Sequence, residues 1–293
     1  MAVIEPHTAY LDDSGSTPNA RIIVAALCVG PIKKWRQFEA AWIAAEQEFG
    51  FKEFHMTEFA GCRRTAWCRD CKNGKTDATK HPWREWSNTK RHKVLTELIR
   101  IVNKNTAQGW GVAQTKDDID KLLRQSKLKE LAPDAFGHEY YTFAATTVGG
   151  SLARWRKQTG QFPPLKLVFD GEHKLELARA FLPEYQVKPK ISADGFENWF
   201  DLDATGIAFE SRKVTRQLLA ADMLAWVTAK IRVAELFPDT YRQMGGWGKE
   251  VSMIVHEFLR QGKLHIGQAH DAFGEWLKQE IDFWEKQNTD GNK

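Results

Sequence analysis

The stretch Ala9–Gly30, AYLDDSGSTPNARIIVAALCVG, decides the fold because two apolar runs flank a group of turn residues. Ser, Gly, Pro and Asn are the residues that favour turns between strands. We therefore expect a strand near residues 7–12, a turn over 14–19 and a second strand over 21–29. This hairpin would begin a β-sheet.

The rest of the chain predicts helices between later strands. Residues 51–59 indicate a short extended piece that runs into a turn, and residues 61–88 lack apolar periodicity, as an irregular insertion would. An early hairpin followed by strands separated by helices predicts an α/β domain with a mixed sheet covered by helices. The other expected strands lie near 107–114, 165–170 and 206–211, and the expected helices near 33–50, 89–104, 117–123, 138–158, 172–182, 213–234 and, as a pair, 247–287.

These elements suggest one domain over residues 1–235, with a basic insertion at 61–93. Residues 236–293 are expected to form a helical C-terminal extension packed on the same domain. The chain has 293 residues, of which 42% are hydrophobic, and this is enough for a large core.

Composition narrows the class of protein. No run of 18 apolar residues is present, so no membrane-spanning helix is expected. The N-terminus lacks the pattern of a secretory signal. The four cysteines are too few and too clustered for a disulfide scaffold, and together these features favour a cytoplasmic protein.

Residues 61–93 carry a strong local positive charge. They contain ten Lys and Arg residues against three acids, in a chain whose formal net charge is +4. Basic residues interleaved with Trp67, Trp83 and Trp86 suit a surface that follows phosphates and stacks on bases. A solvated basic loop explains the composition equally well. The candidate nucleic-acid-binding residues are Arg63, Arg64, Trp67, Arg69, Lys72 and Lys75.

The same segment holds a candidate zinc site. Cys62, Cys68 and Cys71, with His81 ten residues further on, could supply the four nitrogen and sulfur ligands of a structural zinc ion. Such a site would make an otherwise polar loop rigid. The alternative is three unrelated thiols in a reducing compartment.

Asp12 and Asp13 stand together at the end of the first expected strand, where Asp is disfavoured. Side chains alternate along a strand, so Asp12 shares a face with Tyr10, and Asp13 shares the other face with Leu11. A turn initiated by an Asp side chain explains one of the two acids. We expect Asp12 to be a metal ligand and Asp13 to shape the turn or support that ligand.

Three further acids lie where packing alone would not place them. Asp170 ends an apolar strand, at the sheet edge where ligands bind in open α/β sheets, although it could also cap a following helix. Asp222 lies within an apolar helix, where a carboxylate is costly unless it has partners or faces solvent. Glu58 lies close to His55, as an acid–base pair or metal ligand would, although Thr57 could open a short capped helix.

Carboxylates gathered from distant elements cannot all stay ionised without a cation. Oxygen ligands without a cage of Cys and His favour Mg²⁺ or Mn²⁺. Such ions can stabilise the attacking and leaving oxygens of a phosphoryl displacement. The acids therefore predict a metal-dependent enzyme that cuts phosphodiester bonds.

Five segments together resemble the domain of unknown function 3800 family, over roughly residues 8–235. Members are similar to RNase H-fold proteins of bacteria and phages and are regarded as metal-dependent nucleases. The first and last segments are the more specific ones. The segments are Tyr10–Gly15 (YLDDSG), Phe54–Phe59 (FHMTEF), Val168–Asp170 (VFD), Glu210–Lys213 (ESRK) and Gln217–Ala225 (QLLAADMLA).

The resemblance implies a sheet with the Asp of the first strand at its centre, a second acid at the end of the fourth strand and a third on the closing helix. These are Asp12, Asp170 and Asp222, which would hold Mg²⁺ or Mn²⁺, with Glu58 as a fourth catalytic candidate. Asp13, His55 and Lys213 are expected to support them. This sequence departs from the family pattern in having Asp13 in place of Glu and in an extra residue between Gln217 and Asp222.

Two other classes of function remain at this point. A nucleic-acid-binding or regulatory protein could use the same fold without cleavage, because fold does not fix function. The stretch DDSGST also resembles the first phosphate loop of actin-like ATPases and the nucleophile loop of haloacid-dehalogenase-like phosphatases. The latter need a second acid where Ser14 stands, and the former need a second glycine-rich loop that the chain does not clearly have.

Overall fold

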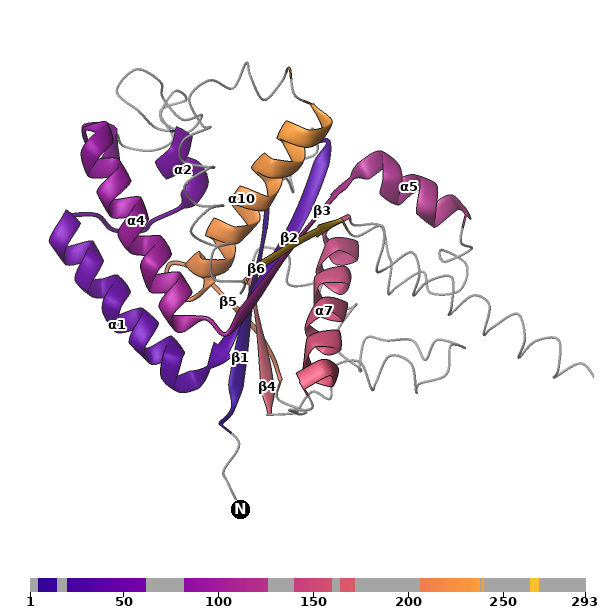
Figure 1. The fold of residues 1–293 in the computed structure, drawn as a ribbon, viewed down its shortest axis with the longest axis horizontal. Helices are drawn as coiled ribbons and strands as arrows, with labels where there is room; N and C mark the ends of the chain where they lie inside the picture. Colours follow the sequence, from indigo (N-terminus) through magenta and orange to yellow (C-terminus); the bar gives the residue numbers. More distant parts are fainter. Residues whose placement is uncertain are drawn as a thin grey trace, which may run out of the picture.

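The computed structural model of the chain describes residues 5–14, 20–61, 82–125, 140–159, 164–171, 206–237, 239 and 264–268. Their central feature is a six-stranded mixed sheet (Figure 1). In the order β5-β4-β1-β2-β3-β6, its strands are Ile207–Glu210, Leu165–Asp170, His7–Ser14, Ile22–Pro31, Gln108–Thr115 and Leu264–Gln268. The α/β fold with a mixed sheet flanked by helices is therefore confirmed.

Strand β1 lies inside the sheet, with a different neighbour on each side. It pairs antiparallel with β2, where Asp12 is opposite Ala26, and parallel with β4, where Leu11 is opposite Phe169. The expected hairpin is thus formed. Strand β2 also pairs antiparallel with β3, whereas the β4–β5 and β3–β6 pairs are parallel. Asp12 therefore lies on an interior strand.

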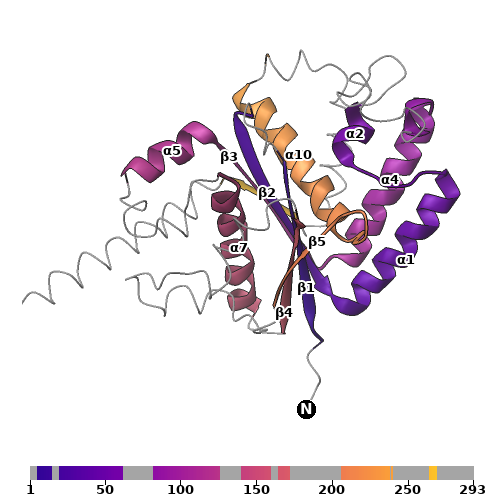
Figure 2. The ribbon, with the colours of Figure 1, turned by 180° about the vertical axis from the view of Figure 1, so that it is seen from behind.

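Helices α10 (Leu218–Leu236) and α7 (Tyr140–Thr159) cover opposite faces of the sheet (Figure 2). Successive side chains of β2 point to opposite faces of the sheet, so this strand packs against both layers of helices. Because both of its faces are buried, its sequence is apolar throughout. Val24 and Ala26 pack in the cluster that contains α10, and Ile23 and Ala25 pack in the cluster that contains α7.

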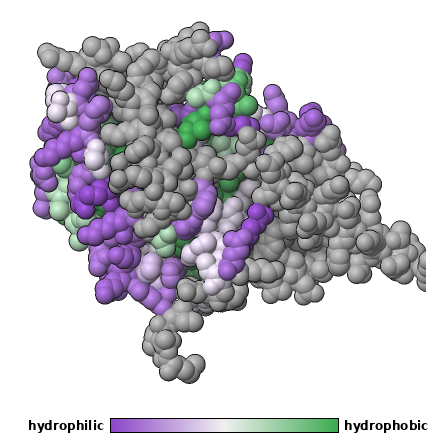
Figure 3. Space-filling view, in the orientation of Figure 1, coloured by the Kyte–Doolittle hydropathy of each residue, from purple (hydrophilic) through white to green (hydrophobic). Residues whose placement is uncertain are grey.

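Helices α1 (Ile32–Phe49) and α4 (Asn88–Asn105) lie against each other on the α10 side (Figure 1). Aromatic residues spaced at helical intervals make the buried face of α1, and the helix ends at Gly50, whose φ of 73° suits glycine. The outer surface of this side is largely hydrophilic (Figure 3). The remaining helices within the described residues are α2 (Met56–Gly61), the 3-10 turn η2 (Pro82–Arg84) and α5 (Lys116–Gln125).

Three expectations about local structure are wrong in part. Residues Met56–Gly61 form a helix rather than an extended piece and turn. The helix expected from residue 213 begins at Leu218, because turns occupy the preceding residues. Strand β6 lies within the pair of helices expected over 247–287, and apolar spacing alone does not distinguish a short strand from a helix.

The basic segment also needs correction at its described end. Trp83 is buried in the core between Phe54 and Phe59, so it cannot stack on bases. Arg91 is buried as well, and its guanidinium donates hydrogen bonds to the backbone carbonyls of Trp83 and Phe59. These two side chains stabilise the fold and do not belong to an exposed nucleic-acid surface.

Among the described residues, no helix combines the length and apolar character needed to cross a bilayer. The helix expected over 172–182 lies outside the described residues.

Candidate functional site

Three buried carboxylates come together at one end of the sheet. Asp12 follows Leu11 on β1, and Asp170 follows Phe169 on the parallel strand β4, so two paired positions lead directly into the two acids. Asp222 lies in α10, which packs across β1. The negative charges of Asp170 and Asp222 both act on Asp12. Residues far apart in the sequence thus form one acidic cluster.

Asp222 is held in place by a different part of the chain. The first half of α10 is buried all round, so a carboxylate there needs polar partners. The backbone N–H of Met56, at the start of α2, donates a hydrogen bond to its Oδ2 at 2.7 Å. His55 Nε2 lies 3.3 Å from its Oδ1. Asp222 therefore has the polar partners that a carboxylate needs inside a buried helix.

His55 lies between two acids. Its Nδ1 is 3.6 Å from Glu58 Oε1, while its Nε2 faces Asp222. Burial lowers the pKa of His55, but the charge and hydrogen bond of Asp222, with help from Glu58, outweigh burial and raise the pKa to about 10. His55 is consequently charged at neutral pH. In this state it supplies a positive charge rather than an electron pair for a metal.

The charge of His55 sets the ionisation of Asp222 in turn. Burial alone would raise the pKa of Asp222, but the charge and hydrogen bond of His55 and the N–H of Met56 lower it below its usual value. Asp222 is therefore ionised at neutral pH.

The two carboxylate oxygens of Asp12 have different surroundings. Its Oδ1 accepts a hydrogen bond from the backbone N–H of Asp13 at 2.8 Å, whereas its buried Oδ2 accepts none from the described residues. Burial raises the pKa of Asp12 well above its usual value, and the charges of Asp222, Asp13 and Asp170 raise it further. One oxygen of Asp12 is thus held by the backbone, and the other faces the cluster.

Arg212 supplies a cation between Asp12 and Asp170. Its Nη1 lies 3.9 Å from Asp12 Oδ2, and its Nε lies 3.7 Å from Asp170 Oδ2. It also lowers the pKa values of Asp12 and Asp222 and opposes the charge on His55. Among the described residues, no three His, Cys, Asp or Glu side chains are placed so that they could together hold a metal ion. Around Asp12 and Asp170, it is the guanidinium that balances the carboxylates.

A cavity of about 450 Å³ opens beside the cluster. His55, Glu58 and Arg212 line it together with the cations Lys52, Lys213 and Arg216. Arg216 is paired with Glu46, Nη2 to Oε2, at 3.1 Å. Glu46, Glu53 and Glu58 line the cavity too, so it borders the acidic cluster with a modest excess of positive charge, which suits an anionic ligand.

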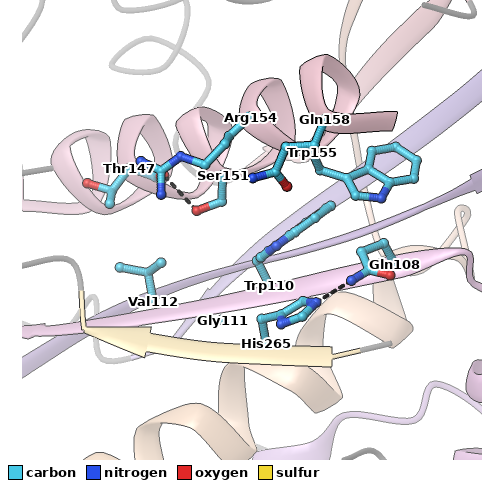
Figure 4. Close-up of a pocket in the computed structure, with 10 residues that line it drawn as sticks. All are labelled: Gln108, Trp110, Gly111, Val112, Thr147, Ser151, Arg154, Trp155, Gln158 and His265. Atoms are coloured by element: carbon cyan, nitrogen blue, oxygen red, sulfur yellow. Dashed lines mark hydrogen bonds between the residues drawn. The ribbon is translucent and has the colours of Figure 1, made fainter. Parts of the chain in front are cut away.

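A second cavity, of about 290 Å³, lies between α7 and the strands β3 and β6 (Figure 4). Trp110 stacks on His265 there, and Trp155 meets Trp110 edge to face. Gln108 is hydrogen-bonded to His265. None of the described residues that line it is a carboxylate, so its chemistry differs from that of the acidic cluster.

The structure places each sequence-derived candidate that it describes. Asp12, Asp170 and Asp222 converge, His55 lies between Asp222 and Glu58, and the exposed Lys213 lines the cavity. Asp13 adjoins Asp12 through its backbone and its charge. The candidates outside the described residues are Cys62, Cys68, Cys71 and His81 for zinc, and Arg63, Arg64, Trp67, Arg69, Lys72 and Lys75 for nucleic acid.

Sequence reasoning assigned no role to Arg212 or Tyr141. Arg212 comes two residues after the end of β5, whose last residue, Glu210, is paired with Asp170. A cation just beyond the strand next to Asp170 was the available signal. Tyr141 is buried in α7, and burial, with the charges of Asp13, Asp12 and Asp170, raises its pKa well above the usual value. Its place near the acids had no local sequence signal.

Comparison of the chain with protein-family models gives no match, and comparison with curated proteins gives none either.

Proposed function

We propose that this protein is a metal-dependent nuclease with an RNase H-like fold, similar to the domain of unknown function 3800 family. The observation that carries the proposal is the convergence of Asp12, Asp170 and Asp222 in a buried cluster beside a basic cavity. Buried like charges destabilise a protein, so a cluster of them indicates a function for which the residues are retained.

The arrangement of the sheet supports the proposed family. The resemblance implies an acid on a central first strand, one at the end of the fourth strand and one on a closing helix. Asp12 lies on β1, which has neighbours on both sides, and Asp170 is the last residue of β4. Asp222 lies in α10, which covers one face of the sheet.

The donor set suits Mg²⁺ or Mn²⁺. Carboxylate oxygens are the ligands that these ions prefer. Asp12 Oδ2 is buried and accepts no hydrogen bond from the described residues, so it is available to a cation. Both oxygens of Asp222 already have protein partners, but a carboxylate has about four lone-pair sites and retains acceptor capacity.

The chain's own residues would prepare the site for phosphodiester cleavage. In the described arrangement the acids are not close enough to share one ion, so binding would draw Asp12, Asp170 and Asp222 together around it, with Glu58 as the candidate for a fourth ligand. The Asp13 N–H and the Met56 N–H orient two of these carboxylates. A bound divalent ion supplies charge stabilisation for the attacking and leaving oxygens of the phosphoryl transfer. The basic cavity would position the phosphate backbone.

Cleavage assays on labelled single-stranded and duplex DNA and RNA, with Mg²⁺, Mn²⁺ or EDTA, test this proposal. We expect Asp12→Asn and Asp170→Asn to reduce metal-dependent cleavage at least about a hundredfold, because each removes a ligand charge. Asp13→Asn should cost less, since it does not face the cluster as Asp12 does. Glu97→Gln, which alters an exposed ion pair of α4, serves as the matched control and should cleave normally.

Equal cleavage by the parent and by Asp12→Asn would refute the assigned site. Nucleic-acid binding without cleavage under every metal condition would favour the second candidate, a non-catalytic nucleic-acid-binding or regulatory protein. The basic cavity beside the cluster is the observation that supports this alternative.

A further inference from the structure

Arg212 lies near two acids of the cluster, at the distances of long ion pairs. Its distances of 3.9 Å to Asp12 Oδ2 and 3.7 Å to Asp170 Oδ2 exceed those of hydrogen bonds. The two oxygens come from different strands, so one guanidinium neutralises part of the charge of both acids. The side chain is about a quarter exposed, because it also lines the 450 Å³ cavity.

We propose that Arg212 is an exchangeable cation with two anionic partners. Without a metal ion, its guanidinium balances Asp12 and Asp170. When a divalent ion binds these acids, Arg212 leaves them and binds a phosphate of the nucleic acid in the adjoining cavity. This inference rests on the proposed function, and it adds that metal binding and phosphate binding are coupled through one residue.

Electrostatics favours the exchange. Asp12, Asp170 and Asp222 are all buried in one cluster, so the cluster needs positive charge to stay ionised. A guanidinium and a divalent ion that lie against the same carboxylate oxygens repel each other strongly where water is excluded. The guanidinium therefore competes with a metal for Asp12 and Asp170.

The cavity offers the released side chain an anionic ligand to bind. Lys52 and Lys213 line it beside Arg212, and both are exposed. A planar guanidinium makes paired hydrogen bonds to a phosphate, and lysines add charge around it. The cavity volume lies in the range of sites that hold small ligands. The expected ligand is a phosphodiester of the substrate strand, next to the metal-binding acids.

Metal affinity provides the first test, read by calorimetric titration with Mn²⁺ in the absence of nucleic acid. Arg212→Met should bind Mn²⁺ at least tenfold more tightly than the parent, because the competing cation is gone. Arg212→Lys retains a charge and should bind nearly as the parent does. Arg216→Met is the matched control: it removes a cation of the same cavity that pairs with Glu46 instead, and its affinity should stay within about threefold of the parent.

Nucleic-acid affinity provides the second test, read by fluorescence anisotropy with a labelled single-stranded oligonucleotide. In EDTA, the parent and Arg212→Met should bind alike, because Arg212 is engaged with the acids. In Ca²⁺, the parent should bind at least fivefold more tightly than Arg212→Met. The penalty of the substitution should therefore appear only with metal, as reciprocal coupling between two ligands requires.

Circular dichroism spectra should show that all variants are folded before either test. If the parent binds Mn²⁺ and Arg212→Met binds it equally or more weakly, Arg212 does not compete with metal and the inference is wrong. An oligonucleotide penalty of the same size in EDTA and Ca²⁺ overturns it too. If neither the parent nor any variant binds Mn²⁺, the proposed metal site itself fails, and this inference fails with it.

Discussion

The pairing of His55 with Asp222 makes a quantitative prediction for Asp222→Asn. The substitution keeps the shape of the side chain and an oxygen that can accept the Met56 N–H, but it removes the charge that His55 Nε2 faces at 3.3 Å. An opposite charge at such a distance changes a pKa by about 1–3 units. We therefore expect the pKa of His55 to fall by this amount from its value of about 10.

The same change fixes the pH dependence of stability. The stabilising effect of a histidine with a raised pKa is complete below its usual pKa of 6.5 and is lost as the pH rises towards 10. At about 1.4 kcal/mol per unit, the pair contributes about 1.4–4 kcal/mol at the lower pH. At pH 9.5 the parent's His55 is still partly protonated, so the free energy of unfolding of the parent should fall by about 0.7–3 kcal/mol relative to that of Asp222→Asn between pH 6 and pH 9.5.

Two measurements in EDTA check the prediction: NMR titration of the His55 ring, assigned with His55→Gln, and urea unfolding at both pH values. Glu58→Gln is the comparison variant, and it should lower the pKa of His55 less, because Glu58 lies further away and is more exposed than Asp222. An unchanged pKa of His55 in Asp222→Asn would show that His55 and Asp222 do not form the ion pair on which this reasoning depends.

Three other substitutions or reactions test separate parts of the structure. Asp12→Asn should raise the free energy of unfolding in EDTA by about 1 kcal/mol, because it relieves repulsion among buried carboxylates, and a loss of stability in urea unfolding would argue against the cluster. Gly111→Ala should destabilise the protein by about 1–3 kcal/mol, because the added Cβ would lie 2.0 Å from Thr228 Oγ1. In the double variant, Thr228→Ala should recover part of this loss. An unchanged urea midpoint of Gly111→Ala would contradict the close packing of Gly111 against Thr228. Burial raises the pKa of Cys28 to about 12, so peptide mapping should find it alkylated by iodoacetamide only after unfolding, and rapid labelling of the native protein would disprove its burial.

Local patterns were sufficient for the parts of the fold that depend on short-range periodicity. The two apolar runs and the turn residues between them in Ala9–Gly30 predicted the hairpin of β1 and β2, and the spaced aromatics of 33–50 predicted α1. Asp12, Asp170 and Asp222 were recognisable because each contradicts its apolar surroundings. A residue that costs stability where it stands is visible without knowledge of its partners.

The parts that sequence reasoning missed depend on partners distant in the chain. Arg91 was counted with an exposed basic segment, yet its guanidinium lies 4.4 Å from the ring centroid of Phe59 and donates to two backbone carbonyls. Arg212 acquires its role only when β4 and β5 pair and bring it to Asp12 and Asp170. Strand β6 exists because β3 offers an edge to pair with, and a five-residue segment of mixed polarity does not indicate that partner.

Strand β6 has a consequence for how the protein is made. Because it pairs with β3 and is contributed by residues 264–268, a chain emerging from the ribosome contains every described site residue before it can complete its sheet. During that interval β3 presents an unpaired edge, which is a template for pairing with other chains. Synthesis that stops short of β6 would thus yield a protein with its acidic cluster but with the eight-residue β3, in place of the five-residue β6, at the edge of the described sheet, and a longer edge strand is the more prone to aggregation.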